Sequence, residues 1–203
     1  MRLALVILAL PLTACPKSST VDLPPSPSAS DSASASASAS GSDSASLAPP
    51  LPNFKSFPNT PAGAKSLVTA LATPNLDAPA ATILLRPSPA DYKSLFDPAT
   101  ATKIDTLYSP EWDRGSFVIV VRPGQTDIKM FAATPADFKA ANDKSKDFPN
   151  YQRIAPHMIG GATWYRFRFV EPGQEGGNTY DGLVYVNSHW VLIPKPWRGL
   201  DDH

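Results

Sequence analysis

The sequence predicts an α+β domain in which N-terminal helices pack on a curved antiparallel sheet. Two observations predict this class. Four helix-start signals are spread over residues 60–135, and an aromatic stretch with the two-residue period of strands occupies residues 163–197. Helices that run ahead of a group of strands, without regular alternation, are typical of α+β domains.

The helix-start signals share one arrangement, a residue with a side-chain oxygen followed directly by proline. The first residue suits the N-cap and the proline suits the first helical position. The four pairs are Thr60-Pro61, Ser88-Pro89, Asp97-Pro98 and Thr134-Pro135. The second and fourth pairs also have an acid at the third helical position, where it favours the positive end of the helix dipole.

Apolar spacing extends these starts into helices. In the first helix the apolar residues recur at i, i+3, i+4 and i+7, as in a helix with one face on a core. A short second helix is expected over Ala80 to Leu85. The third is anchored by Tyr92 and Phe96, and the fourth carries its own apolar stripe. A fifth, Pro135 to Lys144, is weakly amphipathic and is expected on the surface.

A pair of strands is predicted between the fourth and fifth helices. Ser116 to Val121 is apolar on both faces, which favours a central strand covered on both sides. Pro123-Gly124 suits a turn, after which Ile128 to Ala133 is expected to return as the partner strand. Phe148 to Gly161 is interpreted as an irregular connection.

The stretch from residue 163 onwards predicts a three-stranded meander. Tyr165, Phe167 and Phe169 alternate with two arginines, which is typical of a half-buried antiparallel strand. Thr179 to Val186 and His189 to Ile193 follow as strands joined by a two-residue turn. The total expected is five strands.

The end of this sheet is marked by Pro194 and Pro196, which have no N–H group for a ladder hydrogen bond. Trp197 is therefore expected to fold back as an end cap.

This order of elements resembles the NTF2-like, or SnoaL-like, superfamily over about Asn53 to Leu200. The resemblance implies N-terminal helices that close over a bent sheet and leave a cone-shaped pocket. The expected fifth helix interrupts the sheet where the common pattern has a hairpin. A cystatin-like or another helix-on-sheet arrangement is the alternative.

The N-terminus has the features of an export signal. Met1 and Arg2 precede an apolar run that is too short to span a membrane, and the run ends in Leu12-Thr13-Ala14-Cys15. These four residues resemble the lipobox of bacterial lipoproteins, which implies a signal peptide over residues 1–14 and a lipid-modified Cys15. An ordinary secretory signal with an incidental cysteine is the alternative.

The resemblance to lipoproteins also implies a location. Two or more acyl chains on Cys15 would anchor the protein stably to a membrane. Pro16 stands where the inner-membrane sorting pattern has aspartate, which favours the outer membrane of a Gram-negative bacterium, with the protein facing the periplasm or the cell surface.

Residues 15–52 consist mainly of serine, alanine and proline and are predicted to be a disordered tether, since they offer too few large apolar side chains to fold. A silk-like strand is the alternative for the Ser-Ala repeat. The globular α+β domain is predicted over residues 53–203.

Composition excludes some function classes. The formal net charge is zero and no basic stripe is present, so no nucleic-acid partner is expected. The sequence has no nucleophile-elbow, Walker, dinucleotide or zinc-protease motif. The three histidines lack metal-ligand spacing, so neither a metal nor a cofactor is predicted. His189 is expected to be an exposed loop residue.

The candidate pocket residues are Tyr165, Asp181, Tyr185 and Trp190. Asp181 is the central one, because an acid beside Gly182 in an apolar strand suggests a bulge that redirects one side chain. NTF2-like enzymes place an acid with tyrosines inside the cone.

Each candidate has a structural alternative. For Asp181 the favoured alternative is an ion pair across strands with Arg166 or Arg168. Strand aromatics such as Trp164, Trp190 and Trp197 are more often core residues than pocket residues.

Two function classes follow. The first is a membrane-tethered envelope lipoprotein whose domain binds a small ligand or an envelope protein without catalysis. The second is an NTF2-like isomerase or hydrolase that uses Asp181. A cone-shaped fold with an acid facing an empty pocket favours the second class, and a pocket filled by the tryptophans favours the first.

Overall fold

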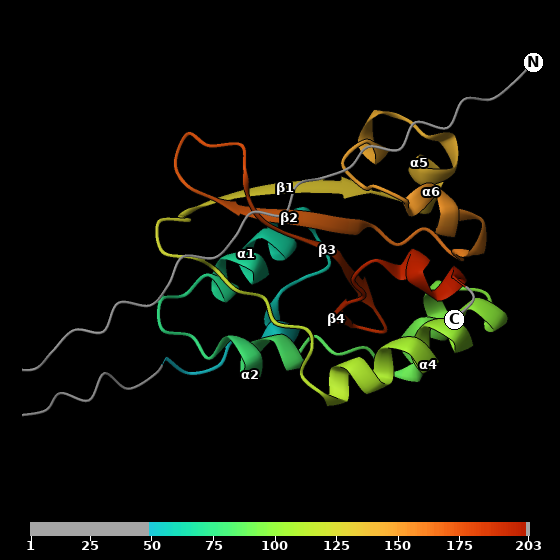
Figure 1. Ribbon diagram of the computed structural model, residues 1–203, viewed down its shortest axis with the longest axis horizontal. Coiled ribbons are helices and arrows are strands. Elements are labelled where there is room, and N and C mark those ends of the chain that lie inside the picture. The colour runs from blue at the N-terminus through green and yellow to red at the C-terminus, as the bar shows by residue number, and fades with distance from the viewer. Residues whose placement is uncertain (1–48, 202–203) are drawn as a thin grey trace, which may run out of the picture. The chain divides into compact units, whose positions relative to one another are not determined.

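A four-stranded antiparallel open sheet forms the centre of the domain, and its strands lie in chain order (Figure 1). The computed structural model describes residues 49–201. The strands are β1 (Asp127–Ala133), β2 (Trp164–Val170), β3 (Gly177–Val186) and β4 (His189–Leu192). Helices precede and flank this sheet, so the predicted α+β class is confirmed.

Six α-helices and four short 3-10 helices complete the described part of the chain. The α-helices are α1 (Pro61–Leu71), α2 (Ala78–Ile83), α3 (Pro89–Leu95), α4 (Pro98–Asp113), α5 (Pro135–Ala140) and α6 (Tyr151–Ile154). The 3-10 helices are η1 (Phe54–Ser56), η2 (Asp143–Ser145), η3 (Ala155–His157) and η4 (Pro196–Leu200).

The four predicted N-caps all form. Each side-chain oxygen accepts the backbone N–H three residues further on, and the caps at Ser88 and Thr134 also close a capping box with their acids. Asp77 caps α2 in the same way, and this helix begins two residues before the expected range. These caps satisfy N–H groups that a helix start leaves unpaired.

The predicted meander is also confirmed. β2 pairs with β3, and β3 turns straight back into β4 through Asn187 and Ser188, whose φ angles are 46° and 65°. Positive φ at both residues matches the twist of a two-residue hairpin. The three aromatic residues predicted on one face of β2 are buried there, at 3% exposure or less.

A bulge interrupts the pairing of β2 with β3 at the predicted place. Tyr165 lies opposite Leu183, but the next residue, Arg166, lies opposite Asp181, so Gly182 is the extra residue. Gly182 has a φ of 88°, which a residue without Cβ adopts at low cost. Because side chains alternate between faces, the bulge moves Asp181 to the face opposite that of Leu183.

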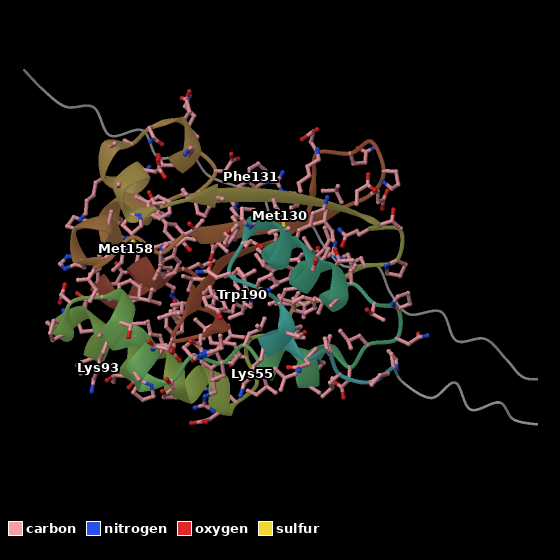
Figure 2. All side chains as sticks on the ribbon, turned by 180° about the vertical axis from the view of Figure 1, so that it is seen from behind. Lys55, Lys93, Met130, Phe131, Met158 and Trp190 are labelled. Carbon is pink, nitrogen blue, oxygen red and sulfur yellow. The ribbon has the colours of Figure 1, made fainter. Side chains whose placement is uncertain are left out.

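Both faces of the sheet are covered. On the face of Tyr165, the indole of Trp190 packs against that ring and donates from Nε1 to the carbonyl of Phe57, just after η1. On the other face, Trp164 packs against Phe96 at the end of α3 and Tyr151 in α6. Trp190 lies near the middle of the domain in Figure 2. The three tryptophans of the C-terminal stretch are therefore core residues.

The expected central strand at Ser116 to Val121 is wrong. This segment has no regular secondary structure and joins α4 to the turn before β1. Among its residues only Ile119 is buried, and Val120 is 45% exposed. A run of apolar residues predicts extended backbone, but it does not show whether a neighbouring strand is available for pairing. The described sheet therefore has four strands instead of five.

The fifth helix lies at the surface with one face buried, as its weak amphipathicity predicts, but it is shorter than expected. α5 ends at Ala140, and Ala141 follows in the left-handed conformation. Phe138 is fully buried, with its ring centroid 5.2 Å from that of Phe148 and 4.8 Å from that of Tyr151. The irregular connection expected at 148–161 contains α6, which supplies Tyr151 to this cluster.

The sheet ends as the prolines predict. β4 stops at Leu192, before Pro194, and Trp197 folds back in η4 with its ring 5.1 Å from that of Tyr151. β3 is ten residues long and β4 only four, so the first half of β3 has no strand beside it on that edge. This difference in length creates the opening described next.

Candidate functional site

A cavity of about 290 Å³ lies beside the part of β3 that β4 leaves uncovered. Its walls come from α4, the segment 116–119, β3, and the stretch from the end of β4 through the following turn into η4. The aromatic and charged residues that line the cavity are Tyr108, Phe117, Tyr180, Asp181, Lys195 and Arg198. The volume is at the lower end of the range for small-molecule pockets.

Asp181 is the acid in this cavity. The residue is only 9% exposed, and its Oδ1 accepts the backbone N–H of Lys195 at 2.8 Å. In the described part of the chain, no other hydrogen bond reaches this carboxylate. Its second oxygen therefore remains available to a ligand.

Burial raises the pKa of the Asp181 carboxyl group above its usual value, because desolvation disfavours the charged form. The hydrogen bond from the N–H of Lys195 opposes this rise, as do the positive charges of Arg166 and Lys195. Desolvation is the largest of these effects. A carboxylate in this state gains more than an exposed one from a ligand that donates hydrogen bonds to it.

The expected ion pair between Asp181 and an arginine does not form among the described residues. Arg166 lies opposite Asp181 in the register, as that alternative requires, but its guanidinium donates to the carbonyl of Asp147. Arg168 donates to the hydroxyl of Thr179 and to a backbone carbonyl. Both arginines therefore have other acceptors.

Tyr108 supports the turn that brings Lys195 to Asp181. Its hydroxyl lies 2.6 Å from the carbonyl of Pro194 and 2.8 Å from that of Lys195, and it is the donor to both. Burial raises the pKa of this hydroxyl, so it stays protonated. The ring of Tyr108 lies 5.5 Å from that of Phe117, and together they form an aromatic wall.

The segment 116–120 contributes residues 116–119 to the cavity wall. Side chains hold it in place: the hydroxyl of Tyr180 accepts the N–H of Val120 at 2.7 Å and donates to its carbonyl at 2.9 Å. The amide of Asn178 donates to the same carbonyl, and Thr82 accepts the N–H of Ile119. Sequence reasoning missed this wall, although polar Asn178 and Tyr180 near the start of an apolar strand were a signal.

The four predicted pocket residues do not lie together. Tyr165, Tyr185 and Trp190 form one cluster, with the indole 5.7 Å from the first ring and 5.2 Å from the second. Asp181 is on the opposite face because of the bulge. Cys15, the predicted lipidation site, is outside the described residues.

Two histidines pair with acids in the first turns of helices, Asp91 at the third position of α3 and the N-cap Asp97 of α4. His189 is the first residue of β4, not a loop residue, and its Nε2 lies 3.2 Å from Oδ2 of buried Asp91. His157 contacts the α4 cap Asp97 at 2.9 Å. Within residues 49–201 no three acidic, histidine or cysteine side chains are placed to hold a metal ion. His203 lies outside that range.

No family model, curated protein or solved structure matches the chain. In the part of the chain that the structure describes, no helix combines the length and the apolar character needed to cross a membrane.

Proposed function

We propose that this protein is a membrane-tethered lipoprotein of the cell envelope whose α+β domain binds a small ligand in the cavity at Asp181, without catalysis. One observation carries the proposal. A carboxylate that is 9% exposed borders an open cavity, and within residues 49–201 its one hydrogen-bond partner is the N–H of Lys195. A few placed polar groups among apolar walls are typical of ligand sites.

The neighbours of Asp181 favour binding over catalysis. A general base usually acts together with a second group that donates or accepts a proton at the substrate. The two tyrosine hydroxyls that border the cavity are engaged elsewhere, Tyr108 with backbone carbonyls and Tyr180 with Val120. Neither is free to assist a reaction unless these contacts break.

The anchoring part of the proposal rests on the N-terminal sequence. Leu12-Thr13-Ala14-Cys15 is the signal for lipidation, and residues 15–52 serve as the tether. The membrane is thus a partner through Cys15, and the outer membrane of a Gram-negative bacterium is the proposed location. The ligand is then either a small molecule of the envelope or an exposed group of an envelope protein.

An NTF2-like enzyme that uses Asp181, an isomerase or a hydrolase, is the second candidate. One observation favours it: burial raises the pKa of the Asp181 carboxyl group, as it does for many catalytic acids and bases. The NTF2-like cone is the finer proposal for the fold. Helices before the sheet support it, and the place of the cavity at a strand edge instead of inside a cone weighs against it.

A fragment screen tests the binding proposal. We expect small fragments to raise the melting temperature of the full chain in detergent and to shift NMR signals of Phe117, Tyr180 and Lys195. Asp181→Asn should weaken the binding of fragments that carry a positive charge. As a matched control, Asp113→Asn removes a carboxylate outside the cavity and should leave binding unchanged. Fragments that bind only elsewhere, or equally well to Asp181→Asn, would contradict the proposal.

A further inference from the structure

The charged groups of the cavity differ in sign between its interior and its margin. Asp181 is buried, whereas Lys195 and Arg198 line the same cavity and are exposed. Within residues 49–201, the ammonium of Lys195 and the guanidinium of Arg198 form no ion pair or hydrogen bond. The cavity therefore offers one half-satisfied anion inside and two unpaired cations at its margin.

Most of the remaining wall is apolar, although Ser116 and Thr179 also line it. Val118 and Ile119 line it from the segment 116–119, and Leu192 and Pro194 line it from the end of β4 and the turn that follows. Phe117 adds an aromatic ring beside Tyr108. The transfer of a branched aliphatic side chain from water to a surface of this kind is favourable.

We propose that the cavity binds a zwitterion of the α-amino acid class that has an aliphatic side chain. This inference rests on the proposed binding function. The ligand's ammonium would donate to Oδ2 of Asp181, and its carboxylate would accept from Arg198 and Lys195. Its side chain would lie against Val118, Ile119 and Leu192.

Each part of this assignment follows from a separate feature. Charge-assisted hydrogen bonds are stronger than those between neutral groups. An ionised Asp181 carboxylate acts only as an acceptor, so its free oxygen matches a donor such as an ammonium group. Arginine presents a planar set of donors that matches a carboxylate. A cavity of about 290 Å³ is too small for most drug-sized ligands but admits a molecule of amino-acid size.

Calorimetric titration of the full chain in detergent with L-leucine tests the proposal. Two analogues each lack one charge: L-leucine methyl ester keeps the ammonium, and N-acetyl-L-leucine keeps the carboxylate. We expect saturable binding of L-leucine and a dissociation constant about tenfold or more higher for each analogue, because each loses a charge-assisted contact. These comparisons use the native protein, so their outcome does not depend on whether a variant folds.

Two variants then assign the contacts. Asp181→Asn should weaken the binding of L-leucine and of its methyl ester but leave the binding of N-acetyl-L-leucine unchanged. Arg198→Gln should weaken the binding of L-leucine and of N-acetyl-L-leucine but leave that of the methyl ester unchanged. Lys55→Gln, which removes an exposed cation that does not line the cavity, is the control. Equal affinity for all three compounds, or no binding of L-leucine, overturns the inference. If L-leucine fails while other fragments shift the cavity signals, binding at Asp181 stands and only the ligand class is wrong.

Discussion

Replacing Trp190 by alanine removes the largest side chain on the η1 side of the sheet. The indole is 1% exposed, and its Nε1 donates to the carbonyl of Phe57 at 3.0 Å. Its ring contacts those of Tyr165 and Tyr185. The substitution therefore deletes burial, two aromatic contacts and one long-range hydrogen bond at once.

The expected loss of stability is large. Truncation of a buried tryptophan to alanine costs about 3 to 5 kcal/mol. Phe57 would also lose the donor to its carbonyl, and a polar group left without a partner adds about 1 to 3 kcal/mol when water cannot reach it. We therefore expect roughly 4 to 8 kcal/mol, a substantial part of the 5 to 15 kcal/mol that is typical of a domain.

Thermal and urea unfolding of the full chain, followed by circular dichroism, measure this loss. At about 2 to 4 °C per kcal/mol for a chain of this size, the melting temperature should fall by roughly 8 to 32 °C. Trp190→Phe keeps an aromatic ring but not the N–H group. Its melting temperature should therefore lie between those of Trp190→Ala and the native protein.

The control for this experiment is Leu84→Ala, which truncates a side chain that is 47% exposed and should change stability by about 0.5 kcal/mol or less. A Trp190→Ala variant that melts within a few degrees of Leu84→Ala would refute the core assignment, and Trp190 would again be a candidate ligand-stacking residue.

Gly182→Ala should destabilise the fold by more than about 2 kcal/mol, because its Cβ would lie 1.9 Å from the carbonyl oxygen of Ile193 at a φ of 88°. Gly173→Ala, at a φ of 75° with no atom within 4 Å, is the control and should cost only the roughly 1 to 2 kcal/mol of left-handed backbone; equal losses would contradict the role of the close contact. Asp181→Asn should raise the melting temperature at pH 7, because the folded protein raises the pKa of this carboxyl group and so disfavours its charged form. The gain should shrink as the pH falls through the folded pKa, where the wild-type residue takes up its proton; a gain that grows in acid, or a loss at pH 7, would show that the carboxylate is stabilised in the fold. Cys15→Ser should abolish incorporation of a labelled fatty acid, since the sequence has no other cysteine; label that persists on the variant would contradict lipidation at this residue.

Local rules were sufficient wherever a feature depends on residues that are close in sequence. The N-caps at Thr60, Ser88, Asp97 and Thr134 need only an oxygen and the next turn of backbone, and all four form. The same holds for the hairpin at Asn187-Ser188. Even the bulge at Gly182 could be predicted, because a glycine beside an acid in an apolar strand is a local signal.

The candidate site depended on contacts between residues far apart in sequence, which periodicity does not reveal. Asp181 was recognised from the sequence, but the companions predicted for it, Tyr165, Tyr185 and Trp190, lie on the other face of the sheet. The bulge reverses the alternation of side chains, so its position also decides which residues share a face with the acid.

The sequence by itself determined the helix starts, the meander, its end at Pro194 and the presence of a distinctive acid, because backbone geometry and neighbouring side chains fix these features. Only the tertiary structure decided that Ser116 to Val121 lies outside the sheet and forms a cavity wall. Of this apolar run only Ile119 is buried, and Tyr180 and Thr82 hold its backbone where no strand does. The site at Asp181 exists because β4 ends early and this segment passes beside the edge of β3 that β4 leaves open.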